Sequence, residues 1–194
     1  MSLLTSLFFW NKSPTDAPAV IPITRDAFDV VLKKTLVWEG GNDDDPQDPG
    51  GRTSRGIIQR EYNKWCALHG HAQRDVWDAA DIEVASIYHE NYWLPLRCAD
   101  YSPAVACVLF DYGVNSGNHQ AVKDAQRCLG LTADGQLGPA THGALVHCEP
   151  LLFVHHLDAR RLSLLENLPT WHRFGRGWSE RVAGEDKFAT NLIG

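Results

Sequence analysis

The stretch VWEGGNDDDPQDPGGRTSRGI, residues 37–57, joins an apolar run to a loop rich in aspartate, proline and glycine. Upstream, apolar residues recur at spacings of three and four between Phe28 and Leu36, which predicts a helix that ends at Glu39. A glycine at 40 or 41 can take the left-handed conformation that closes a helix. The prolines and glycines that follow exclude helix up to Thr53, so we expect a small β-ribbon near residues 42–58.

The rest of the chain has the spacing of helices separated by glycine and proline. The aromatic and basic tail, residues 171–194, is weakly patterned and predicts no definite element. The fold class is therefore mainly α, with the small ribbon and a helical C-terminal lobe. Helices are predicted over residues 58–68, from 78 or 81 to 93, over 104–114 and 121–129, from Thr141, and over 151–168.

Composition limits the classes of function. A chain of 194 residues with a net charge of −6 is long enough for one domain with its own core and does not favour a phosphate-backbone partner. We therefore expect no nucleic-acid partner, and a monomer. The five cysteines show no CxxC or Cys/His spacing, which argues against a metal site, and no cofactor is expected.

The N-terminal residues 1–22 contain a short apolar stretch, Leu3 to Trp10, with no Lys or Arg before it. That stretch is too short to span a bilayer and is poor as a signal sequence. We expect a flexible or partner-binding tail, with a signal peptide as the alternative. No stable membrane insertion is expected anywhere in the chain.

Glu39 has the position of a general acid. The negative end of a helix dipole and the neighbouring apolar side chains Val37 and Trp38 both favour the protonated form of a glutamate. A general acid must hold a proton near neutral pH until it delivers it. The alternative is a solvated glutamate in the last turn of a helix.

Asp48 and Thr53 follow Glu39 by nine and fourteen residues. A ribbon of this length can fold back across the helix end and bring a second carboxylate and a hydroxyl toward the first. Glycosidic hydrolysis needs two carboxyl groups, one as acid and one to activate water or stabilise the cation. An exposed acidic turn or a calcium loop are the alternatives, although the ligand order of an EF-hand is absent.

This stretch resembles the signature of the glycoside hydrolase family 108 muramidases, which are phage and bacterial endolysins of lysozyme type. Three later blocks extend the resemblance: YHENYW (88–93), FDYGVNSG (110–117) and DGQLGPAT (134–141), the last similar to a turn of small peptidoglycan-binding modules. The positions that carry the first match are Glu39, Gly40, Gly41, Asn42, Pro46, Asp48, Pro49, Gly50, Gly51, Thr53, Gly56 and Ile57.

The resemblance implies a lysozyme-like α+β fold, with a catalytic region over residues 23–115 and a peptidoglycan-binding-like region over 116–194 packed on it. It implies cleavage of the β-1,4 bond between N-acetylmuramic acid and N-acetylglucosamine. Glu39 matches the proposed catalytic glutamate, and its spacing to Asp48 and Thr53 is similar to the triad of phage-type lysozymes, which favours inversion. Arg55 stands where family members often carry an aromatic residue, and it could contact a substrate carboxylate.

Four further residues are candidates for substrate binding. Asp111 and Asn115 share a helix face and could hold an N-acetyl group; alternatively, Asp111 orients another residue and Asn115 caps the helix. Tyr92 and Trp93 could be sugar platforms or, more simply, core residues. Asp134 and Thr141 are expected to form a turn and a helix cap.

The competing function is a non-catalytic peptidoglycan-binding or secretion-accessory protein, which would not need the Glu/Asp/Thr set. A calcium-dependent module is the third reading. For the enzyme, the expected partner is peptidoglycan, and the chain would be made in the cytoplasm and act in the periplasm or cell wall after export or release. The sequence does not indicate the route.

Overall fold

The computed structural model describes residues 27–44 and 51–193. The expected N-terminal tail and Asp48 lie outside these residues. The elements run α1 (Ala27–Glu39), β1 (Asn42–Asp43), β2 (Thr53–Ser54), β3 (Ile57–Ile58), α2 (Gln59–Leu68), η1 (Val76–Asp78), α3 (Asp81–Tyr88), η2 (His89–Trp93), η3 (Cys98–Asp100), α4 (Pro103–Ser116), α5 (Asn118–Cys128), α6 (Pro139–His147), α7 (Pro150–Glu166) and α8 (Trp171–Thr190).

The fold is mainly helical with a small three-stranded antiparallel sheet, which confirms the predicted lysozyme-like α+β class. The strands lie in the order β1-β2-β3, with Asn42 opposite Ser54 and Thr53 opposite Ile58. Gly40 has φ +75°, the left-handed conformation expected just after α1. The ribbon therefore folds back on the end of α1, as the glycine and proline pattern predicts.

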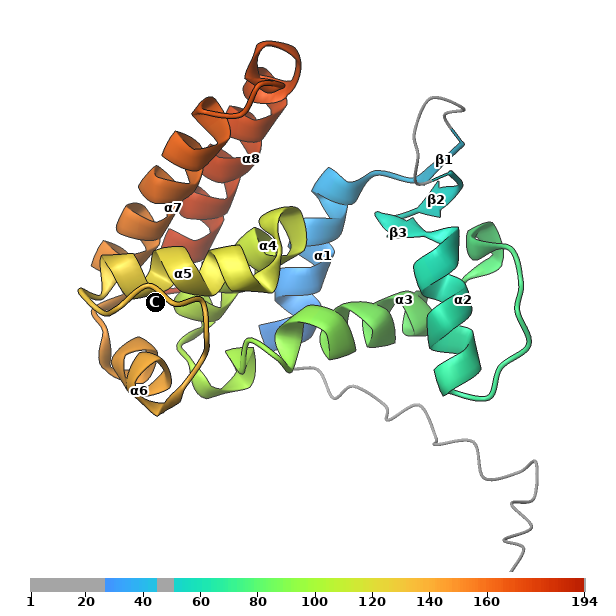
Figure 1. The fold of residues 1–194 in the computed structure, drawn as a ribbon, viewed down its shortest axis with the longest axis horizontal. Coiled ribbons are helices and arrows are strands. Elements are labelled where there is room, and N and C mark those ends of the chain that lie inside the picture. Colours follow the sequence, from blue (N-terminus) through green and yellow to red (C-terminus); the bar gives the residue numbers. More distant parts are fainter. Residues whose placement is uncertain (1–26, 45–50, 194) are drawn as a thin grey trace, which may run out of the picture.

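Helix α4 is the centre of the molecule. Its residues from Ala104 to Gly113 are all buried, and it packs against α1, α5, α7 and α8. Pro103 at its first turn and the Ser102 hydroxyl, which accepts a hydrogen bond from the Val105 amide, explain where it begins. In Figure 1 the hairpin of α7 and α8 projects to one side of α1, and the strands with α2 and α3 lie on the other.

Helix α8 is the main departure from expectation. It extends from Trp171 to Thr190, where the sequence pattern predicts no definite element. Helix prediction from sequence depends on a stripe of apolar residues along one face. The buried face of α8 is instead made mostly of small and charged residues. Its buried positions are Gly175, Arg181, Val182, Glu185 and Ala189. Trp38 at the end of α1 donates its indole N–H to Glu185 across 3.1 Å, which fastens α1 to α8.

The DGQLGPAT turn is held from within the protein. The Gln126 amide nitrogen donates to the Asp134 carboxylate at 2.7 Å and to the Thr141 hydroxyl at 3.0 Å. Thr141 lies inside α6, whose N-cap is Gly138, so the expectation that Thr141 caps this helix is wrong. An added β-carbon at Gly135 would collide with the His119 ring, so this turn requires glycine.

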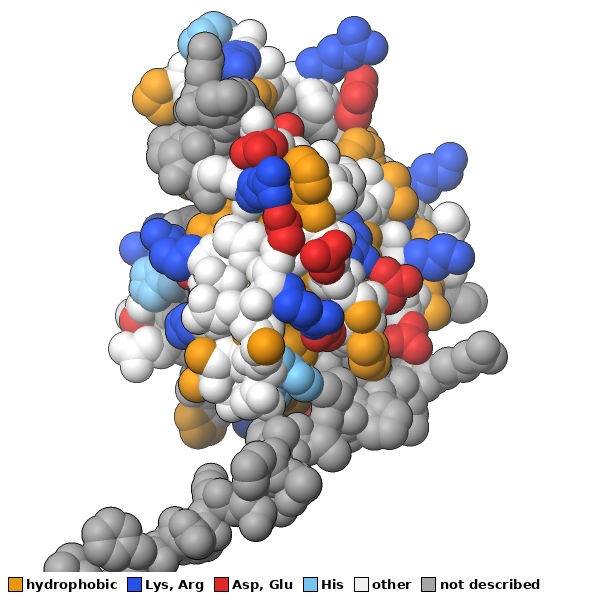
Figure 2. Space-filling model, turned by 90° about the vertical axis from the view of Figure 1, so that its right-hand side faces the viewer, with side chains coloured by type: hydrophobic (Ala, Val, Ile, Leu, Met, Phe, Trp, Pro, Cys, Tyr) orange, Lys and Arg blue, Asp and Glu red, His pale blue; other side chains and the backbone are white. Residues whose placement is uncertain are grey.

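The surface of the described residues carries both signs of charge. Viewed from the side of the strands and α2, acidic and basic side chains are intermixed (Figure 2). Within residues 27–44 and 51–193, no helix combines the length and the apolar character needed to span a bilayer. All five cysteines are unpaired, and Cys66, Cys98 and Cys107 are buried.

Candidate active site

Glu39 is the last residue of α1 and lies between α8 and the ribbon. Its Oε1 accepts a hydrogen bond from Nη2 of Arg181 at 2.7 Å, and its side chain is 16% exposed. Arg181 therefore places a positive charge directly beside the Glu39 carboxyl group. The sequence around Glu39 does not indicate this positive charge, because Arg181 lies 142 positions further along the chain.

Arg181 belongs to a buried chain of charges that ends at Glu39. Its Nε and Nη2 donate to the two oxygens of Asp111 at 3.0 and 2.8 Å. Nη1 of Arg161 on α7 lies 2.8 Å from Asp111 Oδ2. Burial alone would raise the pKa of Asp111, but the two guanidinium groups hold it below its ordinary value. These buried ion pairs hold Arg181 in position, and Arg181 in turn holds one carboxylate oxygen of Glu39.

The second oxygen of Glu39 faces the backbone of Gly56, at the turn between β2 and β3. A β-carbon added at Gly56 would lie 2.5 Å from Glu39 Oε2 and 2.7 Å from the Tyr88 hydroxyl oxygen. Gly56 also has φ +75°, so glycine is required both by the backbone and by the carboxylate beside it. Tyr88 donates to the Arg55 carbonyl at 2.7 Å, and burial followed by the charge of Glu39 raises the pKa of Tyr88.

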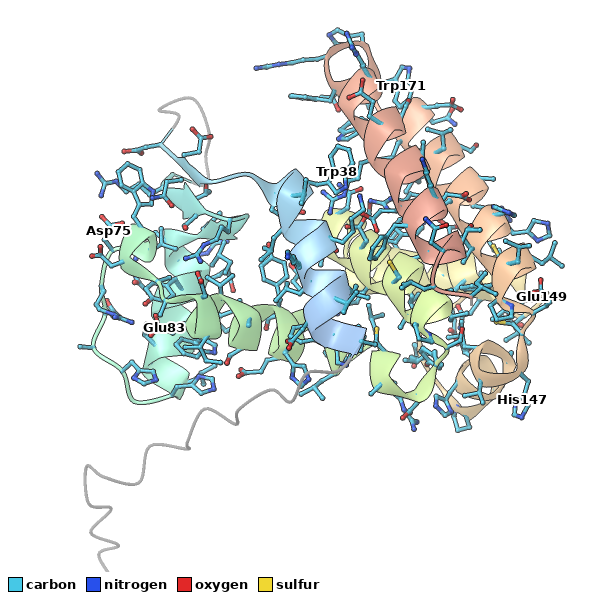
Figure 3. The ribbon with its side chains drawn as sticks, turned by 180° about the vertical axis from the view of Figure 1, so that it is seen from behind. Trp38, Asp75, Glu83, His147, Glu149 and Trp171 are labelled. Atoms are coloured by element: carbon cyan, nitrogen blue, oxygen red, sulfur yellow. The ribbon has the colours of Figure 1, made fainter. Side chains whose placement is uncertain are left out.

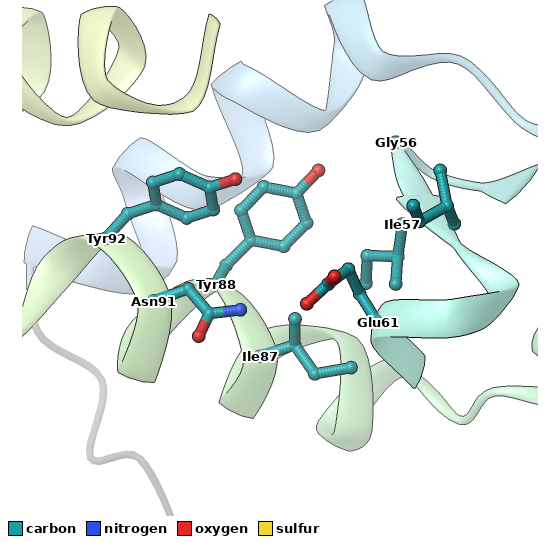
Figure 4. Close-up of a pocket in the computed structure, with 8 residues that line it drawn as sticks. Gly56, Ile57, Glu61, Ile87, Tyr88, Asn91 and Tyr92 are labelled. Carbon is teal, nitrogen blue, oxygen red and sulfur yellow. The ribbon is translucent and has the colours of Figure 1, made fainter. Parts of the chain in front are cut away.

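A cavity of about 480 Å³ borders this turn (Figure 4). Its walls come from the β3 strand, α2, α3 and η2. Burial raises the pKa of Tyr92, and the negative charges of Glu39 and Glu61 raise it further. Figure 4 shows the Glu61 carboxylate and the Asn91 amide among the side chains that line the cavity. Besides Glu61 and Asn91, it is lined by Gly56, Ile57, Ile58, Ile87, Tyr88 and Tyr92.

Two predicted residues, Thr53 and Arg55, lie in the ribbon that follows Glu39. Thr53 lies on β2, and the Arg55 amide donates to the Gly41 carbonyl at 2.9 Å, which fixes the ribbon beside the end of α1. The guanidinium of Arg55 is engaged elsewhere, with the Asp81 carboxylate and the Ala79 carbonyl, each at 2.5 Å. This geometry favours a role for Arg55 in fastening the ribbon rather than in contacting substrate.

Two predicted substrate contacts have structural roles instead. Trp93 is 4% exposed and packs edge-on against Phe28 and Phe110, so it is a core residue. Asp111 is fully buried and both its oxygens face arginines, so the geometry supports the alternative in which Asp111 orients another residue. Tyr92 lines the cavity. Asn115 is four residues past Asp111 but faces a different hollow, between α4, α5, α7 and α8.

Four residues of the site are not identified by the sequence alone: Arg161, Arg181, Glu61 and Tyr88. One signal was present for the arginines, because Asp111 interrupts an otherwise apolar helix and a buried aspartate requires a cationic partner. The identity of that partner depends on how α7 and α8 pack, which local pattern does not indicate. In the part of the chain that the structure describes, no three His, Cys, Asp or Glu side chains gather as metal ligands would.

Comparison with known proteins places this geometry in a family. The sequence profile of the family described as Glycosyl hydrolase 108 matches residues 32–117, which include Glu39, the ribbon, the cavity residues and Asp111. No curated protein sequence matches the chain.

A solved structure titled "Structure of Brucella abortus SagA" is similar to this chain at 30% sequence identity and a TM-score of 0.74. The similarity covers 85% of this chain and 94% of that one, a larger share of the chain than the residues that the family profile matches. The chain therefore belongs to the glycosyl hydrolase 108 family.

Proposed function

We propose that this glycosyl hydrolase cleaves the β-1,4 bond between N-acetylmuramic acid and N-acetylglucosamine in peptidoglycan, with Glu39 as the general acid. Family membership supports peptidoglycan as the substrate. The observation that carries the role of Glu39 is its placement: one carboxylate oxygen is held by Arg181, and the other faces Gly56 at the edge of the cavity.

Glu39 would deliver its proton to the glycosidic oxygen from Oε2, the oxygen on the side of the ribbon. When the proton leaves, a carboxylate remains, and the adjacent Arg181 stabilises this charge. The absence of a side chain at Gly56 lets the sugar chain approach the carboxyl group closely. Tyr88 donates a hydrogen bond to the Arg55 carbonyl and so holds in place the turn that lies beside Glu39.

The second half of the reaction needs a group that activates water. Asp48 is the proposed base, with Thr53 as the residue that helps to position the water. Thr53 lies on β2, whose register against β1 puts it opposite Asp43. A water held between a carboxylate and the sugar would attack the face opposite the leaving group and invert the anomeric carbon.

The remaining expectations complete the proposal. Residues 23–115 would form the catalytic region, and residues 116–194 would help to hold peptidoglycan. The protein would act as a monomer in the periplasm or cell wall after export or release from the cytoplasm.

The decisive test is Glu39→Gln on purified sacculi. We expect loss of release of reducing ends with the fold intact, because glutamine keeps the hydrogen bond to Arg181 but has no proton to deliver. The matched control is Glu180→Gln, at a glutamate on α8 that is 56% exposed and should be silent. Full activity of Glu39→Gln would refute the proposal, whereas binding of sacculi by an inactive wild-type chain would favour a peptidoglycan-binding protein.

A further inference from the structure

A second hollow lies on the α8 side of the molecule, away from the ribbon. Its volume is about 320 Å³. Three polar side chains, Asn115, Ser116 and Gln120, line it together with Trp178 and three leucines of the hairpin of α7 and α8. Nothing in the proposed catalytic steps uses this hollow.

The hollow lies one helical turn from the residues that hold Glu39. Asn115 follows Asp111 by four residues on α4, and Trp178 precedes Arg181 by three residues on α8. At 1.5 Å per residue these steps are about 6 and 4.5 Å along the helix axes. Glu39 touches Gly56 of the first cavity, and its partner Arg181 is one turn from the second. The second hollow is therefore close, along α4 and α8, to the residues that hold Glu39.

The lining has the chemistry of an N-acetylated sugar site. The Gln120 amide nitrogen donates to Asp124 at 2.8 Å, which fixes the orientation of its amide group and directs its carbonyl oxygen away from that carboxylate. The Ser116 hydroxyl donates to Asn115 Oδ1 at 3.2 Å, so these two polar groups are also ordered. An acetamido group presents one donor, one acceptor and a methyl group, which suit fixed amides beside leucines.

An aromatic surface extends from this hollow toward the free end of the hairpin. Trp178 has the rings of Trp171 and Phe174 at centroid distances of 6.1 and 5.7 Å. A β-carbon at Gly175 would lie 2.6 Å from the Trp171 ring, so glycine at this position lets the ring lie flat against α8. Figure 3 shows Trp171 near the tip of the hairpin, far from the core. Phe174 is 43% exposed, so a large part of this aromatic side chain faces solvent and does not contribute to the core.

We propose that this hollow binds an N-acetylated sugar of the glycan strand that lies beyond the two sugars joined by the cleaved bond, with Trp178 as the stacking surface and Gln120 and Asn115 as hydrogen-bonding groups. The inference rests on the proposed function for the identity of the polymer. Aromatic rings beside fixed polar groups suit sugars, which have an apolar face and a polar edge.

The test measures binding of peptide-free glycan strands, prepared by amidase treatment of sacculi, to the Glu39→Gln protein by titration calorimetry. In that background, Trp178→Leu and Gln120→Ala should each weaken the affinity for long strands about five- to tenfold. Leucine keeps an apolar side chain at 178 but removes the aromatic ring. Leu152→Ala, at an exposed leucine on α7, is the control and should bind unchanged.

A second measurement separates binding from structural damage. With Glu39 intact, Trp178→Leu should raise KM for long strands but leave kcat/KM for the shortest cleavable oligosaccharide unchanged, because only long strands reach the hollow. Unchanged affinity for long strands in both variants would overturn the inference and leave the proposed function standing. Cleavage by Glu39→Gln would overturn the catalytic proposal, while glycan binding would still test the hollow.

Anionic phospholipid vesicles provide the competing outcome. Arg173 and Arg176 lie beside the aromatic surface on α8, so the same residues have the composition of a membrane-facing helix. Vesicle binding that Trp178→Leu abolishes, with glycan affinity unaltered, would assign the surface to lipid and refute the sugar site.

Discussion

Replacing Arg181 by methionine should lower the free energy of unfolding by about 3 to 5 kcal/mol, the range for removing one partner of a buried ion pair. Arg181 is only 9% exposed, so water screens its charge weakly. Without it, Asp111 keeps one cationic partner, Arg161, and the Glu39 carboxylate loses the guanidinium beside it. Burial lowers the pKa of Arg181, but Asp111 and Glu39 together raise it above its ordinary value. The attraction of the two carboxylates for the guanidinium is therefore larger than the cost of removing the guanidinium from water.

For a chain of this length, each kcal/mol shifts the melting temperature by about 2 to 4 °C, so Arg181→Met should melt about 6 to 20 °C lower. Thermal unfolding followed by circular dichroism at pH 7 measures this shift. The control is Arg176→Met on the same helix, where the arginine is 92% exposed and paired with an exposed Glu180. Such a surface pair contributes about 0 to 1 kcal/mol. Equal melting of the two variants would refute the view that the buried charges stabilise the site.

Arg181→Lys separates charge from geometry. Lysine keeps the positive charge, but one ammonium group cannot reproduce the two contacts to Asp111 together with the contact to Glu39. We expect a folded protein whose kcat on sacculi falls while KM changes little. Wild-type kcat in Arg181→Lys would show that a positive charge alone is sufficient.

Three further predictions concern single positions. Gly56→Ala should abolish activity in the sacculus assay because the added methyl group displaces the Glu39 carboxyl. The control is Gly51→Ala, which should stay active: Gly51 has φ +65° and so a similar backbone strain, but no atom lies within 4 Å of the added β-carbon. Glu61→Gln should raise KM more than it lowers kcat, since Glu61 lines the cavity; steady-state kinetics on soluble glycan would contradict this if kcat alone fell. Burial raises the pKa of Asp158 well above its ordinary value. The native protein therefore keeps a proton on Asp158 that the unfolded chain loses above about pH 4. Because the folded state binds the extra proton, the free energy of unfolding should fall as the pH rises from about 4 through the pKa of the folded state. Asp158→Asn should flatten that fall in urea unfolding between pH 5 and 8, and an unchanged slope would contradict the reasoning.

The sequence predicts the parts of this fold that depend on local chemistry. The apolar spacing before Glu39 and the glycines after it define the end of α1, and the prolines explain why a ribbon follows instead of a helix. The helix over residues 104–114 is also correctly predicted, with Pro103 at its first turn. These features require only near neighbours in the chain, which is why a single sequence is sufficient.

The parts that depend on distant residues could not be predicted in the same way. Helix α8 buries Arg181 and Glu185. The partners of Arg181 are Glu39, 142 positions away in the chain, and Asp111, 70 positions away, and Glu185 pairs with the still more distant Lys34. No periodic pattern in the sequence extends over such separations. Asp111 carried the signal that a cation must be near, but three-dimensional packing decides which one. Trp93 shows the converse, since its aromatic character suits a sugar platform until the positions of Phe28 and Phe110 are known.

The central claim is that Glu39 delivers a proton to the bond that follows N-acetylmuramic acid. Mass spectrometry of sacculi digested by the wild-type protein and by Glu39→Gln tests it most directly. We predict products that end in reducing N-acetylmuramic acid with the wild type and none with the variant. Products that end in reducing N-acetylglucosamine, or the same products from Glu39→Gln, would contradict it.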